Sequence, residues 1–423
     1  MSVELMNTGV EEAARRDESD PLAVYRERFH VPVNWIGEPV VYLCGNSLGL
    51  QPIGAIDFVE HELRQWREIA VEGHFTGTHP WMPYHEFVTD GVARIVGALS
   101  AEVIAMNTLT VNLHLMMVSF YRPSGKRRRI AIESRAFPSD RYAAASQISF
   151  HGLDPATDLV ELEPRTGEHT LRTSDIVEFL DREGSDIALV LLGGVNYYSG
   201  QLLDIPAITE AGHRNGCVVG FDLAHAVGNV SLQLHDWDVD FAVWCSYKYL
   251  NAGPGGIAGA FVHERHLTDR SLPRFAGWWG HEKSSRFSMP RSFKPIPTAE
   301  GWQISNPAIL TLAALRASLE VFDSVGMDRL RKKSTELTRY LESALLSIDN
   351  RPFEIITPSS SDERGAQLSL LFKKNARESY EALKIADVVC DFREPDVIRI
   401  APVPLYNTYA DAQRFADIIA GQI

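Results

Sequence analysis

The chain has 423 residues, of which 45% are hydrophobic and 23% charged, enough for a large core and more than one domain. Its net charge is −14 and its isoelectric point is near 5.5, which argues against a nucleic-acid partner. The longest apolar run, 187–195, is much shorter than the ~20 residues that a membrane helix needs, and the acidic start predicts neither a signal peptide nor a transit peptide.

The four cysteines are scattered along the sequence and form no CxxC pair; they are Cys44, Cys217, Cys245 and Cys390. Zinc sites and disulfide frameworks show characteristic cysteine spacings, so neither is indicated and we expect no metal. Scattered thiols without a targeting segment predict a reduced, cytoplasmic protein that binds no membrane.

The first segment, residues 1–72, contains one clear helical pattern over 52–70. We expect this segment to pack on a smaller lobe or to cross to a partner subunit.

Residues 73–306 are expected to form a large α/β domain with a mainly parallel, seven-stranded sheet flanked by helices, because short β-rich runs alternate with helical patterns. Several runs are apolar without a clean alternation, as expected of strands buried on both faces. The predicted strands are VIAMN, RIAIES, LVELE, IALVLLG, CVVGFD, FAVWCS and AGAFVH, and the helices are 110–120, 139–150, 174–183 and 206–215.

Residues 307–423 mix helices and strands and predict a smaller α+β domain. A helical stretch reaches residue 346, with a break near Gly326. Beyond it we expect strands at 353–356, 367–372, VVCDF and VIRI, and helices near 379–386 and 410–419.

The strongest local signal is CSYKYLNAGPGGIAGAFV, in which Lys248 follows a β-rich run and precedes a glycine-rich loop. A lysine there can sit at the carboxyl edge of a parallel sheet, where ligands bind. Partial burial is what activates the amine of a Schiff-base lysine. A surface lysine beside a loop is the alternative, and the local sequence supports both about equally.

Asp222 ends the run CVVGFD, which immediately precedes the predicted strand leading to Lys248. Strands adjacent in sequence often lie close in a sheet, so the two side chains can face one cofactor. A carboxylate held against a pyridine nitrogen keeps that nitrogen protonated and makes the ring an electron sink. The alternatives are a helix N-cap for Asp222 and a structural role for His225, three residues further on.

A phosphorylated cofactor needs a helix N-terminus or a glycine turn at its phosphate. In MNTLTVNLHLMM, Thr110 can cap a helix or donate its hydroxyl to a phosphate, and capping alone is the more common outcome. Tyr247 offers a second hydroxyl. Trp278 and Asn306 lie well downstream of the sheet, from where they could reach the site of a neighbouring subunit.

The segment FPSD places Phe137 just after a predicted strand and Asp140 near a helix start. Phe137 could stack on a pyridine ring, and Asp140 could hydrogen-bond the cofactor. A core aromatic and a helix cap are the alternatives.

Seven segments spread over residues 43–407 together resemble the kynureninase family of fold-type-I pyridoxal-phosphate (PLP) enzymes, in the aspartate aminotransferase superfamily. They are GNSLGLQP, FPSD, GFDLAHAVGN, DFAVWCSYKYLNAGPGGIAGAFVHE, FAGWWGH, ISNPAIL and RIAPVPLYN. SYKYLNAGPGG and FDLAHAVGN are highly specific, whereas turns like GNSLG occur in other enzymes of this fold type. The resemblance implies a PLP-dependent transferase fold of type I, PLP as cofactor, and a homodimer with shared active sites.

The resemblance also implies roles for single residues. Lys248 matches the Schiff-base lysine, Asp222 the carboxylate at the pyridine nitrogen, and Tyr247 a phosphate-binding tyrosine. Further cofactor contacts are implied for Leu109, Thr110, Phe137, Asp140 and His225, and across a dimer for Trp278 and Asn306.

Substrate contacts follow from the same resemblance. Arg399, in VIRIAPVP, matches an arginine that holds the substrate α-carboxylate through two parallel hydrogen bonds. Ser47, His74 and Asn306 match substrate-binding positions. The stretch EGHFTGTHPWMPYHE lies in a substrate-facing region that varies within the family, so the preference for a ring hydroxyl stays open.

The implied reaction is hydrolytic cleavage of the Cβ–Cγ bond of L-kynurenine or 3-hydroxykynurenine, a step of tryptophan degradation. The products are anthranilate, or 3-hydroxyanthranilate, and L-alanine. Lys248 is expected to take the Cα proton as a general base. For Tyr247, proton transfer in later steps and phosphate binding alone are equally good interpretations.

Two alternatives differ in the residues they need. A cysteine desulfurase needs an exposed nucleophilic cysteine on a mobile loop. Cys390 is in roughly the right part of the chain, but VVCDF predicts a buried strand. A non-catalytic binding protein of this fold is expected to have lost Lys248 or Asp222, and both are present.

Overall fold

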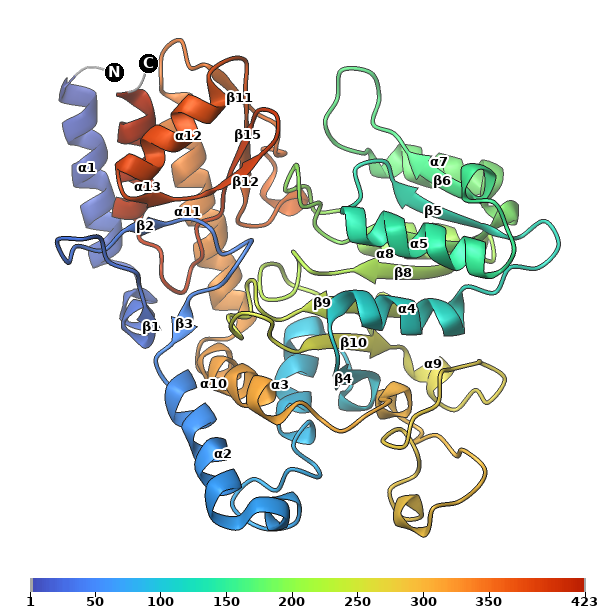
Figure 1. The fold of residues 1–423 in the computed structure, drawn as a ribbon. Helices are drawn as coiled ribbons and strands as arrows, with labels where there is room; N and C mark the ends of the chain where they lie inside the picture. The colour runs from blue at the N-terminus through green and yellow to red at the C-terminus, as the bar shows by residue number, and fades with distance from the viewer. Residues whose placement is uncertain (1–2, 422–423) are drawn as a thin grey trace.

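The computed structural model describes residues 3–421, which form two lobes (Figure 1). The larger lobe is built on a seven-stranded sheet with the strand order β4-β10-β9-β8-β7-β5-β6. The strands are β4 (Val103–Ala105), β5 (Arg129–Glu133), β6 (Leu159–Leu162), β7 (Ile187–Gly193), β8 (Val218–Asp222), β9 (Phe241–Cys245) and β10 (Ala258–Val262). Strand β10 is antiparallel to both of its neighbours, and the strands from β9 to β6 are parallel, so the prediction of a mainly parallel sheet is confirmed.

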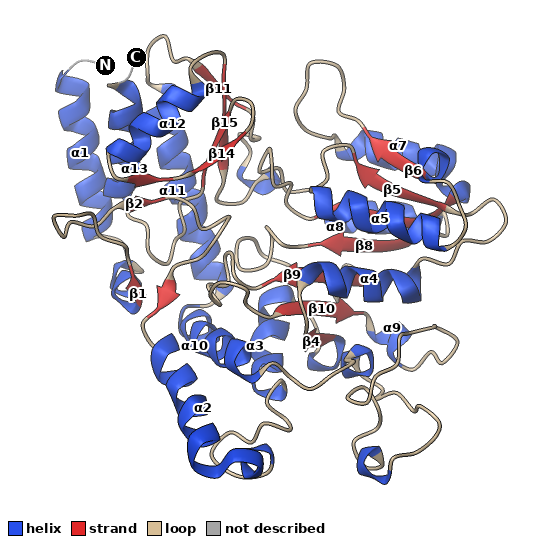
Figure 2. Cartoon of the chain, viewed as in Figure 1, coloured by secondary structure: helices blue, strands red, loops and turns tan. Residues whose placement is uncertain are grey.

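Helices cover both faces of this sheet (Figure 2). One core contains buried side chains of α4 (Leu109–Phe120) and α5 (Pro138–Phe150). The other contains those of α3 (Glu86–Val96), α7 (Thr173–Glu183), α8 (Ile205–Arg214) and α10 (Ile309–Val325). Neighbouring strand residues divide between the two cores, as Ile130 and Ala131 do, because successive side chains point to opposite faces.

The smaller lobe contains an antiparallel sheet with the order β11-β12-β15-β14. Its strands are β11 (Phe353–Ile355), β12 (Leu368–Phe372), β14 (Asp391–Arg393) and β15 (Val397–Ile400). A separate core joins this sheet to α11 (Met327–Leu346), α12 (Ala376–Ile385) and α13 (Tyr409–Ala420). Helix α1 (Val3–Glu18) packs beside α13.

The N-terminal segment divides between the lobes. Strand β2 (Val41–Tyr42) pairs in parallel with β13 (Val388–Val389) in the smaller lobe. The short strands β1 (Phe29–His30) and β3 (Gln51–Pro52) pair with each other, and α2 (Ala55–Ile69) packs against α10. Helix α10, which the predicted boundaries assign to the smaller domain, contributes to a core of the larger lobe. The proposed boundaries after residues 72 and 306 stay predictions. Within residues 3–421, no helix combines the length and apolar character needed to cross a membrane.

We predict that Gly220→Ala destabilises the larger lobe. Gly220 on β8 lies opposite Phe241 on β9, and an added Cβ would sit 2.2 Å from Cζ of that ring. Overpacking of this kind costs about 1–3 kcal/mol. Urea denaturation should show this loss, whereas the control Gly54→Ala should change the free energy of unfolding by less than about 0.5 kcal/mol. Gly54 has a φ of −65° and no heavy atom within 4 Å of an added Cβ. Equal stabilities of the two variants would contradict the prediction.

Candidate active site

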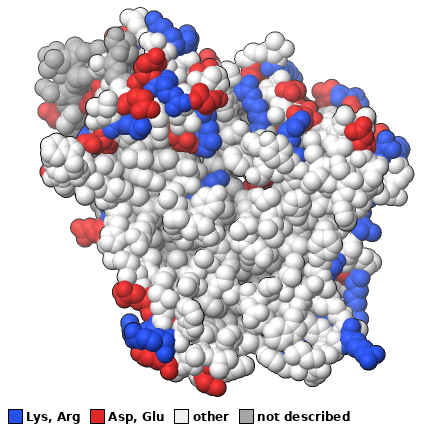
Figure 3. Space-filling model, viewed as in Figure 1, with Lys and Arg blue, Asp and Glu red and all other residues white. Residues whose placement is uncertain are grey.

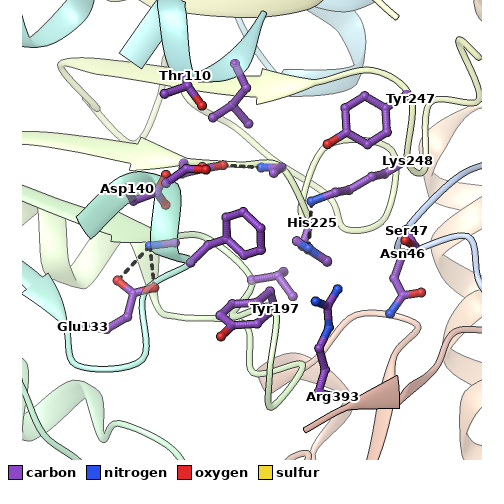
Figure 4. Close-up of a pocket in the computed structure, with 17 residues that line it drawn as sticks. Asn46, Ser47, Thr110, Glu133, Asp140, Tyr197, His225, Tyr247, Lys248 and Arg393 are labelled. Atoms are coloured by element: carbon purple, nitrogen blue, oxygen red, sulfur yellow. Dashed lines mark hydrogen bonds between the residues drawn. The ribbon is translucent and has the colours of Figure 1, made fainter. Parts of the chain in front are cut away.

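A cavity of about 260 Å³ lies at the carboxyl edge of the large sheet, facing the smaller lobe (Figure 4). Strands β5, β7 and β8 end at this cavity with Glu133, Gly193 and Asp222, and Lys248 follows three residues after β9. The carboxyl edge of a parallel sheet is where ligands bind in open α/β folds, because loops and helix N-termini meet there.

Lys248 and His225 make the central contact of the cavity. Nζ of Lys248 lies 2.9 Å from Nε2 of His225, and 6.0 Å from the ring centroids of Phe137 and Tyr247. Burial, followed by the charge of Lys248, lowers the pKa of His225 well below its usual range. The neutral imidazole therefore accepts from Lys248 through Nε2, which leaves its buried Nδ1 without a hydrogen-bond partner.

Three buried carboxyl groups form one side of the cavity. Burial is the first cause that raises the pKa of Asp140 and Asp222, and the Asp222 carboxylate raises that of Asp140 further. Oδ1 of Asp222 accepts a hydrogen bond of 2.7 Å from the backbone N–H of Ala224. Burial also raises the pKa of Glu133 to about 7, and both of its oxygens accept from the N–H of Gly193 at 3.1 Å. Asp140 and Glu133 are therefore protonated more readily than ordinary carboxyl groups.

Another part of the cavity lining is suited to an anion. Leu109 and Thr110 are the first two residues of α4, whose free N–H groups and dipole favour negative charge. Thr108 occupies the N-cap position, so the expectation that Thr110 itself caps this helix is wrong. The side chain of Thr110 is thus available to the cavity, as is that of Tyr247, and Figure 4 shows both on the same side.

The smaller lobe closes a third side. Asn46 and Ser47 belong to the GNSLG turn, and Arg393 ends β14. The turn is held against the lysine loop because the N–H of Gly49 donates to the carbonyl of Tyr247 at 2.8 Å.

Nine of the predicted site residues line this cavity together: Ser47, Leu109, Thr110, Phe137, Asp140, Asp222, His225, Tyr247 and Lys248. Four others do not. Trp278 and Asn306 are exposed, and His74 lies against Trp81 with ring centroids 5.3 Å apart. Arg399 is fully buried behind the cavity, where Nη1 donates to the carbonyl of Tyr197 at 2.6 Å. The chemical roles assigned to all thirteen residues stay predictions.

Sequence reasoning missed several lining residues, including Asn46, Glu133, Tyr197 and Arg393. Glu133 ends an apolar strand in the same way as Asp222, so the rule that found Asp222 would have found Glu133 as well. Asn46 lies within the GNSLG turn that the resemblance had already marked. Arg393 lies in the short strand that follows Cys390 and has no distinguishing local signal.

The residues present fit PLP. Lys248 can hold its carbonyl carbon, Asp222 can face its ring nitrogen, and the start of α4 with Thr110 and Tyr247 can bind its phosphate. Two buried polar atoms without hydrogen-bond partners, Oδ1 of Asp140 and Nδ1 of His225, mark places where a polar ligand would complete the bonding. Phe137 presents an aromatic ring to the same cavity.

Solved structures place the fold among the fold-type-I PLP enzymes. A mutant of the cystine C–S lyase C-DES, described with glycine covalently linked to its PLP cofactor, matches with a TM-score of 0.76. The match covers 90% of this chain and 96% of that one, at 14% identity. Cysteine desulfurases are similarly matched at 15–17% identity, which shows the shared fold.

Sequence comparison identifies the particular family. The chain is 57% identical to a kynureninase of Koribacter versatilis, with 95% of each chain covered, and 56% identical to one of Myxococcus xanthus, with 97% and 96% covered. Residues 330–419 match the model of the kynureninase C-terminal domain. The chain belongs to the kynureninase family.

We predict a pH-dependent stability contribution from Glu133 in the cofactor-free protein. The pKa of this carboxyl is raised from its ordinary value of 4.5 to about 7, so the folded chain keeps a proton that the unfolded chain releases. Stability contributed by Glu133 is therefore fully present below about pH 4.5 and is lost as the pH rises to about 7. The neutral Glu133→Gln should remove this loss.

Urea denaturation of both proteins between pH 5 and pH 8 tests this prediction. The wild type should lose stability relative to Glu133→Gln up to about pH 7 and little beyond it. A constant difference between the two proteins over this range would contradict the raised pKa.

Proposed function

We propose that the chain is a PLP-dependent kynureninase that hydrolyses the Cβ–Cγ bond of L-kynurenine, 3-hydroxykynurenine, or both. The products are anthranilate, or 3-hydroxyanthranilate, and L-alanine, so the enzyme is a hydrolase acting on carbon–carbon bonds in ketonic substances. The observation that carries the proposal is the cavity that joins Lys248, Asp222 and the start of α4, in a chain that is 57% identical to a kynureninase over nearly its whole length.

Different side chains are expected to serve different steps of this reaction. Bound PLP would act as an electron sink for the substrate carbon atoms. Lys248 takes the proton from the substrate Cα, and Asp222 keeps the ring nitrogen protonated. The neutral His225 beside Lys248 can accept a hydrogen bond from its amine and so orient it. The hydroxyl of Tyr247 either binds the phosphate or transfers a proton in the later steps.

Cys390, the cysteine considered for the desulfurase alternative, is unsuited to act as its nucleophile. Burial raises the pKa of Cys390 to about 12, and its side chain does not line the cavity. A thiolate is therefore disfavoured at the position where this activity would need one.

We further propose that the enzyme is a cytoplasmic homodimer with shared active sites. An apolar groove of about 850 Å³ lies between β1, α2, the loop after Lys248 and the start of α10. Figure 3 shows charged side chains mainly around the edges of the molecule and few over its centre, as is typical of the middle of a subunit interface. Exposed apolar side chains also include Trp66, Phe75, Trp278 and Leu310.

We predict that the purified, PLP-loaded protein releases fluorescent anthranilate from L-kynurenine and that Lys248→Ala abolishes this activity. The exposed Lys126 provides a control, and Lys126→Ala should remain active. Borohydride reduction followed by peptide mapping should label Lys248. Failure of the wild type to form anthranilate would overturn the proposed function, and label on a different lysine would overturn the assignment of Lys248. Kinetics on both substrates would establish the ring-hydroxyl preference.

We predict that hybrid dimers recover activity from two inactive variants. Asn306 is exposed and outside the cavity of its own chain, so each site is expected to receive it from the partner. Mixing Lys248→Ala with Asn306→Ala should then give hybrids with one site that carries neither substitution. Activity should rise well above that of either variant alone. An absence of rescue, with hybrids demonstrated by mass spectrometry, would contradict shared sites.

A further inference from the structure

Arg393 is the arginine among the residues that line the active-site cavity. Figure 4 shows its guanidinium rising from β14 on the side of the cavity away from Thr110, toward His225. The side chain keeps 36% of its surface exposed, and its buried Nε has no hydrogen-bond partner. Arg393 therefore presents a charged group with unused donor capacity to the cavity.

One carboxylate serves two arginines at this position. Asp391 accepts from Nη2 of Arg393 at 3.0 Å and also forms an ion pair with Arg399, its direct partner across the β14–β15 ladder. Guanidinium groups remain charged at neutral pH, so two of them against one carboxylate leave one net positive charge. The carboxylate of a bound ligand would neutralise this remaining positive charge.

The second arginine is less available than the first. Arg399 is fully buried and donates through Nη1 to the carbonyl of Tyr197. The ring of Tyr197 lies in front of it, 5.9 Å from Cζ of Arg399 and 5.8 Å from Cζ of Arg393. Asp391 and Tyr197 thus hold Arg393 in place, and Figure 4 shows its guanidinium at the cavity.

The distribution of charged side chains around the cavity indicates where the carboxylate of a bound amino acid would lie. The side that holds Glu133, Asp140 and Asp222 is lined by carboxyl groups, which offer an anion no positive charge. The start of α4 with Thr110 is assigned to the cofactor phosphate. Among the residues that line the cavity, Arg393 is the cationic side chain other than Lys248, at which the substrate amine is expected to react. A planar guanidinium matches a carboxylate better than an ammonium does, because it can donate two parallel hydrogen bonds.

We propose that Arg393 binds the substrate α-carboxylate directly, as a second arginine alongside Arg399, with Asp391 as the internal anion that holds the pair together. This proposal rests on the proposed kynureninase function, because that substrate is an α-amino acid.

The test compares two substrates that differ only in the carboxylate. We would measure kcat and KM for L-kynurenine and for its α-carboxamide with the wild type, Arg393→Gln and Arg393→Lys. The matched control is Arg377→Gln, an exposed arginine of the same lobe that pairs with Glu394. Thermal unfolding of each variant reports folding separately from binding.

Arg393→Gln should lower kcat/KM for L-kynurenine about ten- to a hundredfold, mainly through KM, because a hydrogen bond to a charged group is lost. The same substitution should lower kcat/KM for the carboxamide less than about threefold, since that ligand has no charge to lose. Arg393→Lys should lie between wild type and Arg393→Gln because it keeps a charge without the planar fork. Arg377→Gln should resemble the wild type.

Equal losses for the acid and the carboxamide would overturn the proposal, since Arg393 would then support the structure only. A wild type that forms no anthranilate would instead overturn the proposed function. In that case calorimetric binding of L-alanine and L-alaninamide would test Arg393 independently, and loss of the preference for L-alanine in Arg393→Gln is the expected result. An unchanged preference would overturn the proposal.

Discussion

The burial of three carboxyl groups at one edge of the sheet is the constraint on which the site depends. Glu133 and Asp222 end two parallel strands, and Asp140 lies in the first turn of α5. Isolated charges are costly to bury, so such groups either take up protons or hold a cation. Lys248 faces the cluster from the loop after β9, but its Nζ is already in contact with His225. A ring nitrogen that becomes protonated would be a suitable partner for the carboxylate of Asp222, which is the role proposed for this residue toward PLP.

Close backbone packing couples the two lobes at this site. The GNSLG turn belongs to the segment after β2, yet its Gly49 lies directly against the lysine loop. A Cβ at Gly49 would be 2.3 Å from the carbonyl oxygen of Lys248, so this approach requires glycine. The turn carries Asn46 and Ser47 into the cavity, and Nδ2 of Asn46 donates to Gln367 of the smaller lobe at 2.8 Å. A shift of either lobe would therefore move residues on both sides of Lys248.

The sequence predicted the large sheet well because its strands are short apolar runs separated by helical patterns. All seven predicted runs are strands, and the break at Gly326 separates α10 from α11. Helix α1 was not predicted; its sequence is mostly polar, and it packs beside α13 at the far end of the chain. Nine site residues were found because they follow strands or begin helices, or because the family resemblance marked them. Arg393 was missed because its position depends on the pairing of β14 with β15, which no local pattern reveals.

The distribution of charge across the cavity also constrains how a substrate can lie. Acidic groups occupy the side formed by β5, β8 and α5, while Arg393 and Arg399 provide positive charge on the side of the smaller lobe. Under the proposed function, an α-amino acid whose amine reacts near Lys248 would direct its carboxylate toward the smaller lobe. Asn306, expected at the substrate, is exposed, and His74 lies outside the cavity of its own chain. In the proposed homodimer, residues of the partner subunit would complete the recognition of the aromatic ring, including any hydroxyl group on it.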